Sequence, residues 1–86
     1  MKRSYTECQS IVTTTIFEAL SEGAHVSADK LKEEVEKRME GEENSDIFYA
    51  KEILKGMLCR LTLNGTIVQS YKSPSDVTYW LAHQPT

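Results

Sequence analysis

The side chains that could do chemistry in this sequence are few, and none has the spacing of a catalytic or metal site. His25 and His83 lie far apart and neither belongs to a metal-ligand pattern. There is no CxxC pair, no HExxH motif and no glycine-rich phosphate loop. Cys8 and Cys59 each fall within a helical apolar pattern, which predicts two reduced, half-buried thiols. We therefore expect no enzyme activity, no metal and no cofactor.

The charges are the more informative chemistry because they separate along the chain. Residues 27–46 hold four basic and eight acidic side chains, whereas residues 47–75 hold four basic side chains and one acidic one. The whole chain has a formal net charge of −3. Segregation of this kind lets a small acidic domain present one basic face.

The length allows one domain, residues 1–86, with one modest core and little room for a deep substrate pocket. No apolar run is long enough to cross a bilayer. The basic start, 1–5, leads into a polar stretch where a signal peptide needs an apolar one. These features predict an intracellular protein of the cytoplasm, or of the nucleus if the cell is eukaryotic.

The periodicity of apolar residues predicts a first helix over 5–22. Thr6 and Gln9 have the spacing of a capping box, and Gly23 suits a C-terminal cap. A short strand at 24–26 and a second helix at 27–40 follow. Ser27 is the expected N-cap of that helix, with Asp29 in its first turn.

A third helix is expected over 45–63, capped by Ser45 with Asp46 at its first position. Its apolar row is the strongest periodic signal in the chain: Ile47, Ala50, Ile53, Leu54, Met57, Leu58 and Leu61. The opposite face is expected to carry Phe48, Lys51, Glu52, Lys55 and Cys59. Phe48 is open to two interpretations, a core residue out of phase or a contact residue.

The end of this helix has a competing interpretation. Residues 60–68 also fit a hairpin around Asn64-Gly65, although the shared face of Leu54, Leu58 and Leu61 favours a helix through Leu63. After it, 66–82 is expected to form a hairpin turning at 72–76, with a tail at 83–86. Tyr71, Tyr79 and Trp80 are interpreted mainly as core or half-buried sheet residues. The predicted fold is α+β, with three helices packed on a short antiparallel hairpin in the order α-β-α-α-β-β.

The chain resembles the winged helix-turn-helix superfamily over essentially its whole length. The residues that carry the resemblance are 58–67 (LCRLTLNGTI), where a leucine-rich helix end leads to a glycine and an aliphatic residue, and the aromatic strand 77–82 (VTYWLA). Winged helices that bind DNA place the third helix in the major groove and the hairpin on an adjacent groove or backbone. The resemblance therefore implies a sequence-specific DNA-binding protein, a small transcriptional regulator with duplex DNA as its partner.

The site residues that this resemblance implies lie on three elements. The start of the third helix would read base edges, since Lys donates to guanine and Glu accepts from cytosine. The hairpin turn and the second-helix N-terminus would contact phosphates. The candidates are Tyr49, Lys51, Glu52, Lys55, Lys72, Ser73, Ser75, Ser27 and Lys30. Arg60 lies further along and is expected against the sheet.

A second hypothesis is a winged helix that binds a protein partner and not DNA. His25, Leu31, Glu34 and Val35, followed by a long helix and the closing strand 79–82, also loosely resemble the C-terminal winged helix of cullin-type scaffolds. Four basic residues make a thin phosphate footprint, which a homodimer would double. A basic, polar face on the third helix favours DNA, whereas an apolar patch on Phe48 and Tyr49 favours protein.

Overall fold

The structure, a computed structural model, describes residues 4–82. These form three α-helices and a three-stranded antiparallel sheet, so the predicted α+β class and the order α-β-α-α-β-β are confirmed. The elements are α1 (Tyr5–Ala19), the 3-10 turn η1 (Ser21–Gly23), β1 (Val26–Ser27), α2 (Ala28–Arg38), α3 (Asn44–Leu63), β2 (Ile67–Ser73) and β3 (Asp76–Leu81). None of the described helices is both long and apolar enough to span a membrane.

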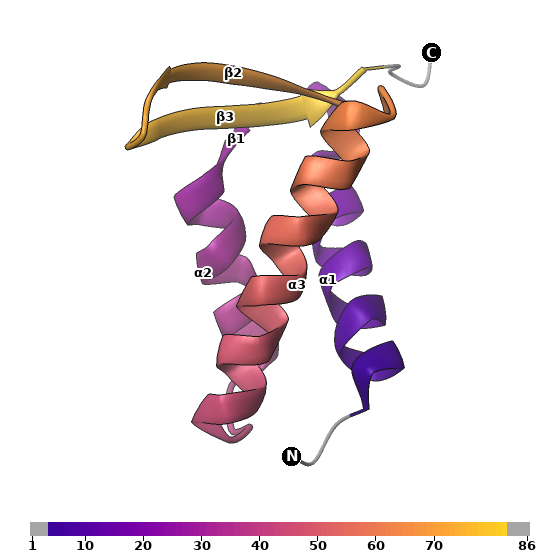
Figure 1. The fold of residues 1–86 in the computed structure, drawn as a ribbon, viewed down its shortest axis with the longest axis vertical. Helices are drawn as coiled ribbons and strands as arrows, with labels where there is room; N and C mark the ends of the chain where they lie inside the picture. Colours follow the sequence, from indigo (N-terminus) through magenta and orange to yellow (C-terminus); the bar gives the residue numbers. More distant parts are fainter. Residues whose placement is uncertain (1–3, 83–86) are drawn as a thin grey trace.

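The three helices run side by side and the sheet lies across one end of them (Figure 1). Each helix contributes one row of buried side chains to a shared core. The rows are Cys8, Val12 and Ile16 from α1, Leu31 and Val35 from α2, and Ala50, Leu54 and Leu58 from α3. Ile67 and Tyr79 close the core from the sheet. No helix here could bury its apolar stripe alone, so the helices depend on one another.

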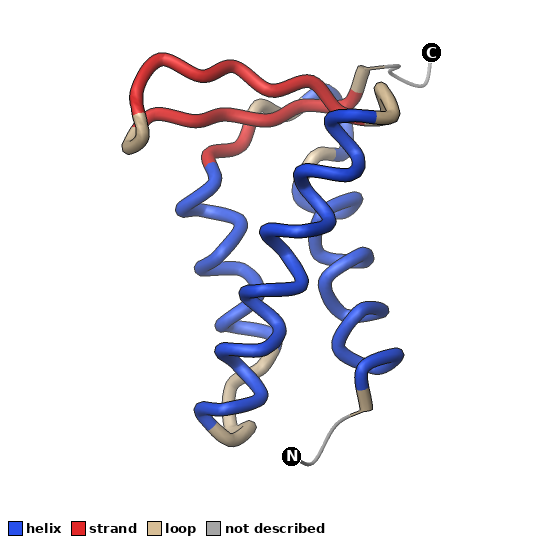
Figure 2. The backbone as a smooth tube through the Cα atoms, in the orientation of Figure 1, coloured by secondary structure: helices blue, strands red, loops and turns tan. Residues whose placement is uncertain are grey.

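The strand order is β1-β3-β2, with β3 in the centre. Val26 of β1 pairs with Tyr79, and Gln69 of β2 pairs with the same residue from the other side. The predicted hairpin is thus confirmed. The predicted short strand at 24–26 forms instead at Val26–Ser27 and adds a third strand to the sheet. Figure 2 shows the long hairpin and the short strand beneath it in red.

The competing hairpin at 60–68 is not what forms, because α3 continues to Leu63 and its cap is Asn64. Gly65 then adopts φ +84°, a left-handed conformation that glycine reaches without a steric penalty. The Asn64 side chain accepts a hydrogen bond from the Thr66 N–H at 2.9 Å. This turn directs the chain straight into β2.

The predicted start and end of the first helix were wrong. The N-cap is Ser4, and Ser4 forms the capping box with Glu7, two residues before the predicted pair of Thr6 and Gln9. The helix ends at Ala19, not at 22, and a 3-10 turn replaces the expected cap at Gly23. Glu22 in that turn has φ +60°, which stops the α-helix from continuing.

The predicted N-cap of the second helix is confirmed, whereas that of the third helix is not. Ser27 caps α2 as predicted, since its hydroxyl accepts from the Lys30 N–H at 3.1 Å. The predicted Ser45 cap of the third helix was wrong: Glu43 occupies the N-cap position and the helix begins at Asn44. Asp46 then falls inside the first turn and is fully buried.

Two interpretations of side-chain burial were also wrong. Cys59 is exposed while Cys8 is buried, so only one thiol lies in the core. Tyr71 is 62% exposed because it lies near the free end of the hairpin, beyond the helices. Phe48, for which two interpretations stood open, is 64% exposed and therefore not core. The predicted tail, 83–86, lies outside the described residues.

Leu58→Ala tests the phase of α3. Leu58 is 5% exposed within the shared core, so we expect the free energy of unfolding to fall by about 2–5 kcal/mol in urea denaturation. Phe48→Ala, a larger truncation in the same helix at a 64% exposed position, is the control and should cost less than about 0.5 kcal/mol. Equal losses of unfolding free energy in the two variants would mean that Leu58 does not face the core.

Candidate functional site

Two lysines and an exposed aromatic ring follow one stripe of α3. Phe48, Lys51, Lys55 and Cys59 succeed one another at steps of three and four residues, which places them on one side of the helix. The Lys51 Nζ lies 3.1 Å from Glu36 Oε1 of α2, so this side of α3 is the one beside α2. We call these four residues the lysine stripe.

Both lysines of the stripe have carboxylate partners. Besides the Lys51–Glu36 pair, Lys55 Nζ lies 3.0 Å from Glu52 Oε2 one turn back on the same helix. All four side chains are at least one-third exposed. Exposed ion pairs of this kind contribute about 0–1 kcal/mol, because water screens the attraction and the side chains lose freedom. Either lysine can therefore exchange its carboxylate for a phosphate at little cost.

The turn of the hairpin lies on the same side of the molecule as the lysine stripe. The free end of the hairpin overhangs α2, on the side of α3 that Lys51 occupies (Figure 1). The exposed Lys72 precedes the turn, and the Ser73 and Ser75 hydroxyls lie 3.3 Å apart across it. The strand register shifts between Tyr71 and Ser73, so the end of the hairpin is irregular. The hairpin turn, which Lys72 precedes, thus lies on the side of α3 where Lys51 pairs with α2.

Ser27 and Lys30, the predicted phosphate contacts at the start of α2, do not lie with the lysine stripe as free donors. The Ser27 hydroxyl is engaged in capping α2. The Lys30 Nζ lies 3.3 Å from Glu34 Oε1, and both residues line a groove between α1 and α2 with Glu18 and Arg38. An ion pair between Arg38 and Glu18 closes that groove. Lys30 therefore lies on the α1 side of α2, away from the lysine stripe.

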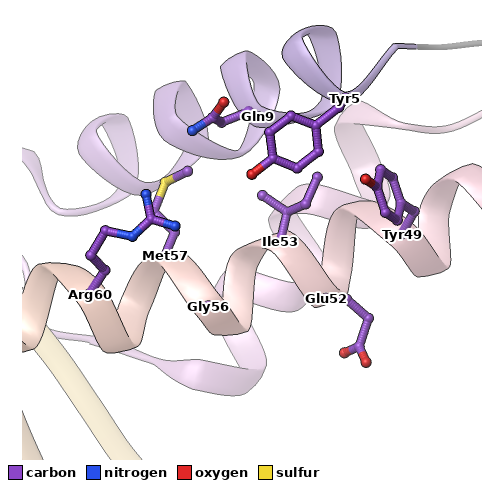
Figure 3. A pocket seen from close by; sticks show the side chains of 8 residues that line it. All are labelled: Tyr5, Gln9, Tyr49, Glu52, Ile53, Gly56, Met57 and Arg60. Atoms are coloured by element: carbon purple, nitrogen blue, oxygen red, sulfur yellow. The ribbon is translucent and has the colours of Figure 1, made fainter.

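Tyr49 also lies apart from the lysines, in a groove between α1 and α3. Its ring meets Tyr5 of α1 edge to face, with ring centroids 6.0 Å apart. Figure 3 shows Tyr5 and Gln9 entering this groove from α1, and Tyr49, Ile53 and Arg60 from α3. The groove has a volume of about 280 Å³. The expectation that Arg60 lies against the sheet was wrong, since it lines this groove.

Glu52 lies between the two surfaces. It lines the mouth of the groove, yet its carboxylate points away from the groove and pairs with Lys55 (Figure 3). A glutamate there is able to accept from a cytosine amino group, but only once Lys55 has released it.

The groove and one aromatic pair are features that the sequence reasoning missed. Tyr5, Gln9 and Gly56 were not predicted to line a groove, although the steps of four, three and four residues along α3 from Tyr49 to Arg60 indicate such a row. His25 stacks on Trp80 with centroids 4.4 Å apart and rings 7° from parallel. Among residues 4–82 no three His, Cys, Asp or Glu side chains come together as a metal site.

Gly56→Ala tests whether the floor of the groove is open in the single chain. A Cβ added at Gly56 meets no atom within 4 Å, and Gly56 lies inside a helix. We expect the free energy of unfolding to rise by about 0.5–1 kcal/mol, because alanine loses less backbone entropy on folding.

Gly65→Ala is the control for this change. It also meets no atom, but its φ of +84° is unfavourable for alanine by about 1–2 kcal/mol. Thermal denaturation of both variants in dilute solution measures the difference. A destabilised Gly56→Ala variant would mean that another group occupies that space.

Comparison with known proteins adds no relative to this description. The chain matches no protein-family model, no curated protein and no solved structure. The case for a function rests on the fold, the charges and the exposed aromatic rings of the chain itself.

Proposed function

We propose that this chain is a small winged-helix domain that binds duplex DNA in a sequence-specific way and acts as a transcriptional regulator. In this proposal α3 enters the major groove and the hairpin turn contacts the backbone. The observation that carries it is that the hairpin turn lies on the side of α3 where Lys51 pairs with α2. The order of elements is the one that the winged-helix resemblance implies.

The charge of this surface suits phosphate binding once its weak ion pairs exchange. Residues 47–75 have three more basic than acidic side chains, although the chain as a whole is acidic. Each lysine that moves from a carboxylate to a phosphate releases a counterion from the DNA, and this release supplies most of the nonspecific affinity. Glu36 and Glu52 are then the competing anions that a phosphate must displace.

The second support for the proposal is that the hydrogen-bonding groups of α3 match base edges in the major groove. On a mixed-sequence duplex both lysines contact phosphates, whereas at a specific site Lys51 and Lys55 are donors that match the two acceptors of guanine in the major groove. Glu52 is an acceptor that matches the cytosine amino group. A base-specific preference at two or three neighbouring positions is the expected result.

Fluorescence anisotropy with a mixed-sequence duplex, at low and at near-physiological salt, tests the proposal. We expect salt-sensitive binding by the parent chain. The double variant Lys51→Ala/Lys55→Ala should bind more weakly and lower the slope of log affinity against log salt by about 1.8, since each lost phosphate contact removes about 0.9.

The matched control is Lys37→Ala/Arg38→Ala, which removes the same charge from the last turn of α2. This control should keep the parent's salt slope. If the two double variants lose affinity and slope equally, only net charge matters and the lysine stripe is not the contact surface. No binding by the parent at low salt would overturn the proposal outright.

One observation favours the protein-partner alternative: the 64% exposed ring of Phe48 heads the lysine stripe. An exposed aromatic ring beside two lysines fits an acidic peptide with an apolar anchor. If this alternative holds, Phe48→Ala should abolish capture of a partner from the native cell by the tagged chain. Phe17→Ala, the same change at a 37% exposed position of α1, is the control. Equal capture by all three chains would contradict it.

A further inference from the structure

A second row of α3 is shaped like one half of a helix pair. Tyr49, Ile53, Gly56, Arg60 and Leu63 succeed one another at steps of four, three, four and three residues. Alternating steps of four and three residues are the spacing with which one helix packs along another. We call this row the outer seam.

The outer seam is open in the single chain. Leu63 at its end is 83% exposed and Tyr49 at its start is 36% exposed. Gly56 at its centre has no neighbour within 4 Å of an added Cβ. The groove along α1 accompanies the seam from Tyr49 to Arg60 (Figure 3). A row with apolar ends and an open centre is a surface for a partner helix.

The geometry points to a second copy of this chain as the occupant, with the two α3 helices antiparallel and crossing at Gly56. In such a pair a two-fold axis relates the copies, so a residue before the crossing faces the residue equally far beyond it on the partner. Glu52 lies four residues before Gly56 and Arg60 lies four residues after it. Each Glu52 therefore faces the partner's Arg60, and the interface gains two ion pairs of opposite charge.

The same symmetry matches the apolar ends of the seam. Tyr49 lies seven residues before Gly56 and Leu63 lies seven after it. The pairing covers the exposed Leu63 with the partner's Tyr49, at both ends of the interface. Gly56 at the centre lets the two backbones approach closely, which a larger side chain would prevent. The charges, the apolar ends and the open centre of the seam therefore all match their counterparts on the second copy when the helices cross at Gly56.

The pairing has a consequence for the lysine stripe. Glu52 must leave Lys55 to meet the partner's Arg60, and this exchange is easy because the Glu52–Lys55 pair is exposed. Dimerisation therefore releases Lys55. At 3.6 residues per turn the stripe lies roughly 120° around α3 from the seam, and the two-fold axis turns both stripes to the same side. The dimer inference goes beyond DNA binding and does not depend on it.

Charge reversal tests this interface with a result that other contacts would not produce. Glu52→Arg leaves two arginines facing each other and Arg60→Glu leaves two glutamates facing each other, so each variant alone should sediment as a monomer. An equimolar mixture should form a one-to-one heterodimer, because each arginine of one variant then faces a glutamate of the other. The parent chain should sediment at twice the monomer mass, and the double variant Glu52→Arg/Arg60→Glu should do so too.

Gly56→Leu supplies the steric test. It should fold, as checked by circular dichroism, because the added side chain meets open space, and it should be monomeric. A monomeric parent at high concentration would overturn the inference, as would a dimer that survives either charge reversal or Gly56→Leu. Failure of the two reversed variants to pair would overturn the Glu52–Arg60 register. Anisotropy with the Gly56→Leu monomer separates the two proposals, since DNA binding by that monomer shows that the lysine stripe works without the dimer.

Discussion

The burial of one apolar row of α3 between α1 and α2 is the constraint on which the rest of the structure depends. Ala50, Leu54 and Leu58 occupy this row and are buried over more than two turns. Because an α-helix places one residue every 100°, fixing this row fixes the direction of every other side chain on α3. The lysine stripe then lies beside α2 and the outer seam lies toward α1. Any change in the phase of α3 would rearrange both surfaces together.

The exposed surface of α3 is controlled by weak ion pairs. Lys51 and Lys55 hold glutamates in the free chain, and neither pair is buried enough to be strong. Such pairs keep the surface nearly neutral until a stronger anion arrives. A phosphate on the lysines, or an arginine on Glu52, shifts the balance without any change in the fold. This arrangement allows an acidic chain to present a basic face.

The sequence predicted the elements well because their apolar rows are regular. The end of the third helix at Leu63 was predicted correctly, because Leu54, Leu58 and Leu61 share a face that a hairpin would have split. The start of α1 was wrong because two overlapping capping boxes fit the sequence, from Ser4 to Glu7 and from Thr6 to Gln9. Ser4 caps the helix, and Glu7 brings a full negative charge to the positive end of the helix dipole, which Gln9 lacks.

The candidate site was predictable only in part. Lys51 and Lys55 follow from helical spacing alone, and the same spacing turns Tyr49 roughly 200° away from Lys51, which separates it from them. The Lys51–Glu36 pair joins two helices, so no local pattern contains it. Likewise, the position of Lys30 in the groove between α1 and α2 depends on how those helices pack. Tertiary packing decides which charges meet across helices, whereas the Lys30–Glu34 and Lys55–Glu52 pairs follow from helical spacing.

Mapping the backbone amide resonances of the isotope-labelled chain during titration with a duplex DNA is the most direct test of the central claim. The account predicts that the largest shifts fall on 48–55 of α3 and on 72–75 of the hairpin, and that both shrink together as salt is raised. It also predicts that α1 stays unchanged. Shifts concentrated on the sheet face around Trp80, or none at any salt concentration, would contradict it.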